Sequence, residues 1–126
     1  MANKKLTAYR RGYWAEIWAI FYLWMKGYKI LAWRYKTKHG EIDVVASKGN
    51  VVVFVEVKAR SNISDALGSV NRKNRVRVEN AAQIFILKNK RYELYSLNFA
   101  VVAIEFGYKF IPRKFTYLDN AWGMGA

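Results

Sequence analysis

The chain of 126 residues carries 22 Lys and Arg against 9 Asp and Glu, a formal net charge of +13, and 53% of its residues are hydrophobic. These values exclude a disordered chain and predict one domain, residues 1–126, whose partner is a polyanion, with nucleic acid ahead of an anionic membrane surface. The absence of cysteine removes disulfides, thiol catalysis and thiolate metal sites, and the single histidine, His39, argues against a histidine-rich metal site or a Ser-His-Asp triad.

A long N-terminal helix is expected over residues 6–25, because this segment lacks proline and ends before Gly27, where glycine favours a stop. Its uncharged apolar run, residues 17–25, is shorter than the roughly 20 residues that a membrane span needs, so a buried helix is expected. No hydrophobic segment with a small-residue cleavage site follows the basic start of the chain. We therefore expect a soluble, cytoplasmic protein without membrane contacts.

Three strands are expected next, over residues 28–35, 41–47 and 50–58, and the last two are rich in valine. The tight turn "SKGN" between these two strands offers Gly49 for a positive φ. The three strands are expected to form a meander.

The second half of the chain is expected to contain one helix and further strands. Residues 60–69 are polar and predict a loop, whereas residues 70–88 have helix-compatible apolar positions. Residues 97–105 predict an apolar strand, and residues 108–111 predict a further one. This order of elements predicts an α/β fold in which a sheet lies between helices.

The stretch "GEIDVVASKGNVVVFVEVKAR", residues 40–60, places three acids and a lysine on strands that are otherwise apolar. If Ala46 pairs with Val51 across the turn, side chains sort by period two onto two faces. The apolar face is then expected to hold Ile42, Val44, Ala46, Val51, Val53, Val55 and Val57. The charged face is expected to hold Glu41, Asp43, Val45, Val52, Phe54, Glu56 and Lys58.

In this register Asp43 faces Phe54 and lies diagonal to Glu56, close enough for both carboxylates to share one ion, and Lys58 follows on the same face. Clustered carboxylates repel each other and are costly to desolvate, so such a cluster usually needs a cation. Oxygen ligands favour Mg²⁺ or Mn²⁺, which clamps a phosphate and lowers the pKa of a bound water. The pattern predicts metal-assisted phosphodiester hydrolysis.

The same stretch resembles the signature of the PD-(D/E)xK nuclease superfamily, with Asp43 in the place of the metal-binding aspartate and "EVK", residues 56–58, as the second half. More narrowly, the chain resembles the YraN-like family of small bacterial proteins, which is similar in fold to archaeal Holliday junction resolvases. The resemblance extends to Gly12, Glu16, Ala19, Leu23 and Gly27-Tyr28 near the start and to "YLDNAW", residues 117–122, near the end.

Two stretches of the chain depart from these relatives. Where they carry an Arg-Phe-Asp run before the late strand, this chain has Asn98-Phe99-Ala100. The proline of the superfamily name is replaced by Ile42, which is common in this branch. Any role of that arginine or aspartate is therefore lost or moved in this chain.

The resemblance implies a restriction endonuclease-like three-layer fold, with a central mixed sheet flanked by helices, and a Mg²⁺- or Mn²⁺-dependent endonuclease acting on DNA, including branched or otherwise structured DNA. In the resolvases it resembles, a glutamate on the first helix joins the metal cluster, which implies that Glu16 lies over Asp43 and Glu56. Glu41 is expected to help in the metal shell, and Lys58 is expected to assist the attacking water. Resolvases of this fold act as symmetric dimers, so a homodimer is also implied.

Basic side chains are the candidates for contacts to the nucleic-acid backbone, which carry no sequence information and weaken as salt rises. They are Arg60, Arg72, Lys73, Arg75, Arg77, Lys4, Lys5, Arg10 and Arg11. Lys73 stands where the superfamily often places a basic or glutamine residue facing the site.

Structural alternatives remain open at each of these positions. The acids and Lys58 form ion pairs at the sheet rim, partly with Arg60 or Arg34, and the basic residues form a solvated helix face. The corresponding alternative function is a nucleic-acid-binding module that has lost turnover. A third reading is a basic protein that adheres to ribosomes or anionic lipid without a specific site.

Overall fold

The structure, a computed structural model, describes residues 3–60 and 62–125. Its centre is a five-stranded sheet in the order β1-β2-β3-β4-β5, in which β3 and β4 run parallel and the other neighbours run antiparallel. The strands are β1 (Lys29–Thr37), β2 (Gly40–Lys48), β3 (Val51–Lys58), β4 (Ser96–Phe106) and β5 (Pro112–Trp122). The helices are α1 (Asn3–Met25), α2 (Ile63–Ser69) and α3 (Arg72–Lys88).

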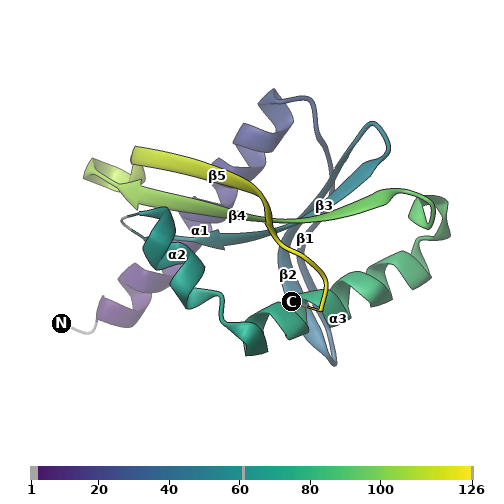
Figure 1. The fold of residues 1–126 in the computed structure, drawn as a ribbon. Coiled ribbons are helices and arrows are strands. Elements are labelled where there is room, and N and C mark those ends of the chain that lie inside the picture. Colours follow the sequence, from purple (N-terminus) through teal and green to yellow (C-terminus); the bar gives the residue numbers. More distant parts are fainter. Residues whose placement is uncertain (1–2, 61, 126) are drawn as a thin grey trace.

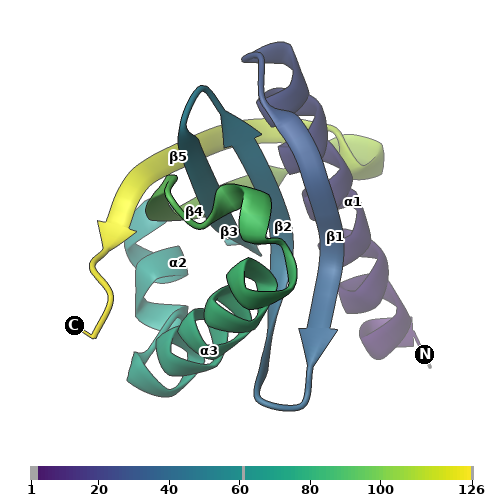
Figure 2. The same ribbon diagram turned by 90° about the vertical axis from the view of Figure 1, so that its right-hand side faces the viewer.

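Helices cover both faces of this sheet, with α1 on one side and α2 and α3 on the other (Figure 1 and Figure 2). The four-residue spacing of Ala15, Ala19 and Leu23 places them on one side of α1, where they pack on the valines of β2 and β3. On the other face Phe85 of α3 packs edge-to-face on Phe54 of β3. The predicted α/β fold, with a central mixed sheet between helices, is confirmed.

The apolar run of residues 17–25 is buried along one side of α1 and not all round it. Leu23 is fully buried, whereas Trp24 and Met25 are each 65% exposed. In the ranges 3–60 and 62–125 no helix combines the length and the apolar character that a membrane crossing requires.

The β2–β3 hairpin differs in register from the predicted one. Ala46 pairs with Val53 instead of Val51, because Lys48 and Val51 already pair and leave a two-residue loop. A shift of two residues preserves the alternation of faces. Ile42 is an exception to the predicted faces, since it packs with the cluster under α3 and not with the one under α1.

Two predictions for the second half of the chain were wrong. Residues 60–69, predicted as a loop, contain α2, whose first turn is capped by the Asn62 side chain accepting the Asp65 N–H. Residues 108–111, predicted as a strand, contain a 3-10 turn in which Lys109 and Phe110 have φ values of 53° and 59°. The strand follows as β5, which begins at Pro112 and pairs with β4 at the edge of the sheet.

Candidate metal-binding site at a fork in the sheet

The sheet divides between β2 and β3. β2 remains paired with β1, and β3 with β4, to the ends of the strands, but the ladder between β2 and β3 stops at Val44 and Val55. We call the opening beyond this last pair the fork. The next residues on the two strands, Asp43 and Glu56, lie at its base.

Asp43 occupies part of the fork with its side chain. Its Oδ2 accepts the backbone N–H of Val57 at 2.8 Å, so a carboxylate satisfies a donor that a neighbouring strand would otherwise satisfy. Burial raises the pKa of Asp43, and the Val57 hydrogen bond opposes that rise. The charge of Glu16 raises this pKa further, whereas the Lys58 ammonium lowers it.

Glu56 is buried, with 8% of its surface exposed. Burial is the largest cause of its raised pKa, and the negative charge of Asp43 is the second. The Lys58 ammonium and the backbone N–H of Asp43 act in the opposite direction. Two carboxylates that share a buried site in this way retain protons to unusually high pH unless a cation takes the place of the protons.

The fork opens into a cavity of about 220 Å³, the fork cavity. The structure brings the five predicted metal and catalytic residues together around it, and α3 contributes two more polar side chains. The polar residues of its lining are Glu16, Glu41, Asp43, Glu56, Lys58, Asn74 and Arg77. Their roles in metal binding and catalysis stay predictions.

Asn74 is a residue of this lining that the sequence did not reveal. It lies in the first turn of α3, where its N–H bonds to the capping side chain of Asn71 and its amide donates to the Ser69 carbonyl. Lys73, the predicted neighbour of the site, is exposed on the helix surface and does not line the fork cavity. Successive side chains of a helix point about 100° apart, so Lys73 and Asn74 point in different directions. The way α3 docks on the sheet determines which of the two faces the fork.

Glu16 reaches the cavity from α1 with one oxygen already engaged. Its Oε1 accepts from Trp33 Nε1 and from Arg34 Nε, both at 2.7 Å. The Arg34 guanidinium in turn lies over the rings of Tyr9, Tyr13 and Trp33, at 5.2–5.8 Å from their centroids. Glu16 therefore forms an ion pair with Arg34. This pair agrees with the alternative interpretation, in which the acids form ion pairs at the rim of the sheet. Throughout the part of the chain that the structure describes, no three His, Cys, Asp or Glu side chains form a ready-made metal-binding group.

Comparison with known proteins identifies the family. The model of the uncharacterised protein family UPF0102 matches residues 15–104, a range that includes both strands of the fork and the start of α3. The chain belongs to the UPF0102 family. The resemblance to the YraN-like family is thereby confirmed at the level of the family.

Relatives of this UPF0102 chain occur in several bacteria. A UPF0102 protein of Bartonella bacilliformis is 44% identical over 97 residues, which cover 77% of this chain and 80% of the relative. One of Agrobacterium fabrum is 41% identical over 113 residues, covering 90% of this chain and 88% of the relative. One of Bradyrhizobium diazoefficiens is 42% identical over 101 residues, covering 80% and 76%. The names of these relatives state no activity.

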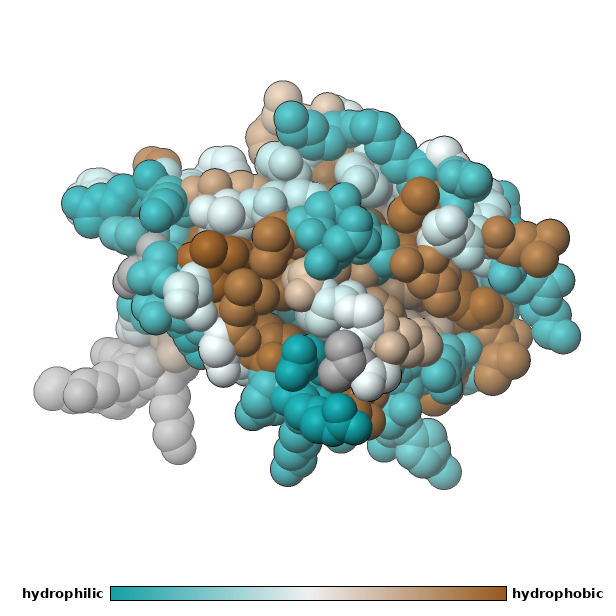
Figure 3. All heavy atoms as spheres, viewed as in Figure 1, coloured by the Kyte–Doolittle hydropathy of each residue, from teal (hydrophilic) through white to brown (hydrophobic). Residues whose placement is uncertain are grey.

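The basic residues predicted to contact nucleic acid lie in different places on the UPF0102 fold. Arg77 lines the fork cavity, and Arg11 and Arg60 line a second cavity beyond the end of β3. Figure 3 shows a hydrophilic surface on the lower edge of the molecule, over the start of α3. The other predicted contacts there or on α1 are Arg10, Arg72 and Lys73, which are exposed, and Arg75, which is half-buried. The side chains of Lys4 and Lys5 lie outside the described residues.

The departure at residues 98–100 lies away from the fork. Asn98 donates to Asp119 and accepts the Asn120 N–H at 3.0 Å, so it joins the first half of β4 to β5. The "YLDNAW" motif continues this junction, because Trp122 Nε1 donates to the buried Glu79 of α3 at 2.9 Å. Glu79 was not singled out from the sequence, since its partner follows 43 residues later.

Proposed function

We propose that this UPF0102 protein is a Mg²⁺- or Mn²⁺-dependent endonuclease that hydrolyses phosphodiester bonds in DNA. The observation that carries the proposal is the convergence of two carboxylates with raised pKa values, Asp43 and Glu56, beside Lys58 at the fork. The resemblance of the two strands to the PD-(D/E)xK signature supports it. The net charge of +13 also favours a polyanionic substrate.

Asp43 and Glu56 fit a small, hard cation, because they offer oxygen ligands and because a cation would relieve the repulsion and burial that raise their pKa values. When bound, the ion supplies charge stabilisation for the phosphate and a lower pKa for a coordinated water. Lys58 holds a positive charge on the same side of β3 as Glu56, where it orients the attacking water. Glu41 and Glu16 add negative charge around the ion.

Arg77 faces this group from α3 and is placed to contact the substrate phosphate. A guanidinium presents a planar set of donors that matches two phosphate oxygens, and it stays charged at every working pH. The fork cavity thus has Glu41, Asp43 and Glu56 on its strands, and Arg77 on α3 faces them with a permanent positive charge. This division allows the carboxylates to hold a metal while the substrate is attracted from the other wall.

Metal binding is tested by thermal melting with and without Mn²⁺. A ligand that binds the native state alone stabilises it by about 2.7 kcal/mol at one hundred times its Kd, so the melting temperature of the native protein should rise by several degrees. Asp43→Asn should abolish this rise, and Glu93→Gln, at an exposed position outside the fork, should retain it. An equal rise in Asp43→Asn would place the ion elsewhere.

Activity is tested by incubating branched, nicked and linear DNA with Mg²⁺ or Mn²⁺. Cleavage of at least one substrate is expected, and Glu56→Gln and Lys58→Ala should each lower the rate by roughly 100-fold or more. Persistent cleavage by Glu56→Gln would rule out this mechanism.

The second candidate is a nucleic-acid-binding module of the same fold without turnover. The engagement of Glu16 by Trp33 and Arg34 favours it, because this pairing occupies one oxygen of the acid that the resemblance assigns to the metal cluster. Salt-dependent binding of DNA without cleavage of any substrate, and without the stabilisation by Mn²⁺, would select this candidate over the nuclease.

A further inference from the structure

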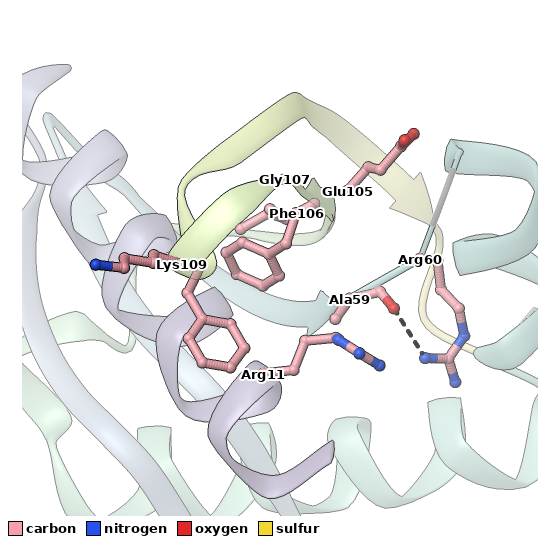
Figure 4. Close-up of a pocket in the computed structure, with 9 residues that line it drawn as sticks. Arg11, Ala59, Arg60, Glu105, Phe106, Gly107 and Lys109 are labelled. Atoms are coloured by element: carbon pink, nitrogen blue, oxygen red, sulfur yellow. Dashed lines mark hydrogen bonds between the residues drawn. The ribbon is translucent and has the colours of Figure 1, made fainter. Parts of the chain in front are cut away.

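A second cavity, of about 400 Å³, opens beyond the end of β3 (Figure 4). Its volume falls within the roughly 300–1,000 Å³ that small-molecule sites occupy. Three separate segments form its walls: α1 through Arg11, the exit of β3 through Arg60, and the end of β4 with the turn that follows it through Phe106 and Phe110. We call it the β3-exit cavity.

Two aromatic rings and two guanidinium groups give the β3-exit cavity its chemical character. The rings of Phe106 and Phe110 stand edge-to-face, with centroids 5.7 Å apart and an interplanar angle of 88°. Figure 4 shows the Arg11 guanidinium directed toward Arg60, which donates to the Ala59 carbonyl at 3.3 Å. The cavity therefore combines an apolar wall with two permanent positive charges.

The acid in the lining, Glu105, does not cancel these charges. In Figure 4 its side chain points away from the cavity, and its carboxylate lies 3.5 Å from Arg113 on β5. Lys109 also points away from Arg11 and Arg60 (Figure 4). An anion entering the cavity would meet Arg11 and Arg60 first.

Phe110 is held in place against its own backbone preference. A positive φ is unusual for a bulky residue because it strains the backbone, yet both Lys109 and Phe110 adopt it. The Trp18 indole fixes this geometry by donating to the Phe110 carbonyl at 2.9 Å, and the Gly107 N–H closes the turn on the Ile111 carbonyl at 2.8 Å. The ring therefore stands on a turn that two hydrogen bonds anchor.

We infer that the β3-exit cavity binds one unpaired nucleotide of a nucleic-acid strand, with its base against Phe106 and Phe110 and its phosphate on Arg11 and Arg60. Aromatic rings stack on any base, and guanidinium groups bind phosphate in a bidentate manner. The assignment to a strand rests on the proposed function. Arg60 follows Lys58 by two residues, about 7 Å of extended chain, so the neighbouring phosphate of that strand would lie at the fork.

The first test is an NMR titration of the full chain in EDTA with deoxyadenosine 5′-monophosphate, deoxyadenosine and inorganic phosphate. The monophosphate should bind at least about fivefold more tightly than either fragment, because each fragment lacks one of the two contacts. Arg11→Ala and Phe110→Leu should each weaken its binding by roughly fivefold or more. Equal affinity for phosphate and for the monophosphate would overturn the inference.

Matched variants separate these contacts from general effects. Tyr108→Leu removes an 80% exposed ring from the same turn, and Lys114→Ala removes one positive charge from β5 outside the cavity. Both should bind the monophosphate within about twofold of the native chain. If Lys114→Ala lost as much affinity for the monophosphate as Arg11→Ala, net charge alone would explain the binding. That result would overturn the proposed site. The melting temperature and amide spectrum of Phe110→Leu verify that its fold is intact, and Phe106→Leu repeats the test on the other ring.

The second test places the nucleotide in a strand. A short DNA duplex with an unpaired tail should bind at least about threefold more tightly than the blunt duplex, and Phe110→Leu should remove this advantage while keeping the affinity for the blunt duplex. A cavity that binds the free monophosphate but gives no advantage to the tail would overturn the assignment to a strand.

The test of nucleotide binding is independent of the tests of the proposed nuclease, because binding in EDTA requires neither metal nor cleavage. Glu56→Gln should therefore bind the monophosphate like the native chain. A protein that binds the monophosphate and cleaves no DNA would retain this inference and lose the nuclease. A protein that cleaves DNA and does not bind the monophosphate would lose only this inference.

Discussion

Single residues at the fork determine how the stability of the protein depends on pH. Burial raises the pKa of Glu56 to about 8 and that of Asp43 to about 6. Between the unfolded value of 4.5 for glutamate and about 8, the native state therefore holds protons that the unfolded chain has released. Because the native state binds more protons than the unfolded state, its stability falls as the pH rises through this window.

Glu56→Gln removes this titration. In EDTA we compare the melting temperature of Glu56→Gln with that of the native protein. The difference in favour of the variant should increase from about pH 5 to about pH 8.5 and reach roughly 4 °C or more at the higher pH. Thermal melting at both pH values measures the change, and Glu93→Gln serves as the control at an exposed position. A difference that is the same at both pH values would contradict the raised pKa.

Glu79 is a second buried acid, with a structural role. It accepts from Trp122 Nε1 at 2.9 Å and from the Gly125 N–H at 3.1 Å, so it fastens the end of β5 to α3. Trp122→Phe removes one donor from a buried carboxylate and should lower the free energy of unfolding by about 1–3 kcal/mol. Urea unfolding measures the loss. Trp24→Phe, at an exposed position of α1, should change it by less than about 0.5 kcal/mol.

At the scale of elements, the contact between β2 and α3 determines which side chains reach the fork. A Cβ placed on Gly40 would lie 1.7 Å from the carbonyl oxygen of Arg77, so the strand touches the helix backbone directly. Glycine permits this approach because it has no side chain. The same approach brings Asn74 and Arg77 over Asp43 and Glu56.

Gly40→Ala should therefore force α3 away from β2 and lower the free energy of unfolding by at least about 2 kcal/mol. It should also lower cleavage, because Arg77 moves with the helix. Urea unfolding and the DNA assay measure the two effects. Gly68→Ala in α2 is the matched control: a Cβ there meets no atom within 4 Å, and alanine favours the helix, so stability should stay equal or rise. Equal losses in both variants would refute the close contact.

The elements differ in how far their sequences determine them. α1, β2 and β3 were predictable because their apolar patterns and the Gly49 turn are local, and the register error of two residues still placed Asp43 and Glu56 near each other beyond the last pair of the β2–β3 ladder. α2 has only seven residues, too few for a clear periodicity, and its start depends on the Asn62 side chain. β5 forms because β4 offers it an edge, and such a long-range pairing leaves little local pattern.

The candidate site shows the same limit. The acids of the fork were predictable from strand alternation and from the resemblance. The positions of Asn74 and Arg77 depend on how α3 docks, and the engagement of Glu16 depends on Arg34, whose φ of 55° a strand pattern does not predict.

At the scale of the whole molecule, the charge of +13 should make DNA binding strongly dependent on salt. Each phosphate contact contributes a slope of about −0.9 to the dependence of log K on log salt. Arg77→Ala should therefore reduce that slope by about one unit, measured by fluorescence anisotropy from about 50 to about 300 mM salt. Lys88→Ala, at the far end of α3, should leave the slope unchanged. A slope that Arg77→Ala does not alter would remove Arg77 from the interface.

A homodimer follows from the resemblance to resolvases and stays a prediction. A measurement of mass in solution should give twice the 14.7 kDa of one chain. Light scattering after size-exclusion chromatography, over a range of concentrations, distinguishes the two states. A mass of one chain at every concentration would contradict the dimer.

The hydrogen bond from Val57 to Asp43 makes one backbone amide of β3 a reporter on the fork. An ion that draws the Asp43 carboxylate toward Glu56 would lengthen or break this bond, whereas the amides that β3 donates within its ladders would keep their partners. The nitrogen-proton resonance of Val57 and its rate of solvent exchange would then follow occupancy of the fork directly. The Val57 amide would therefore report cation binding at the fork without an added fluorescent label, a substrate or turnover.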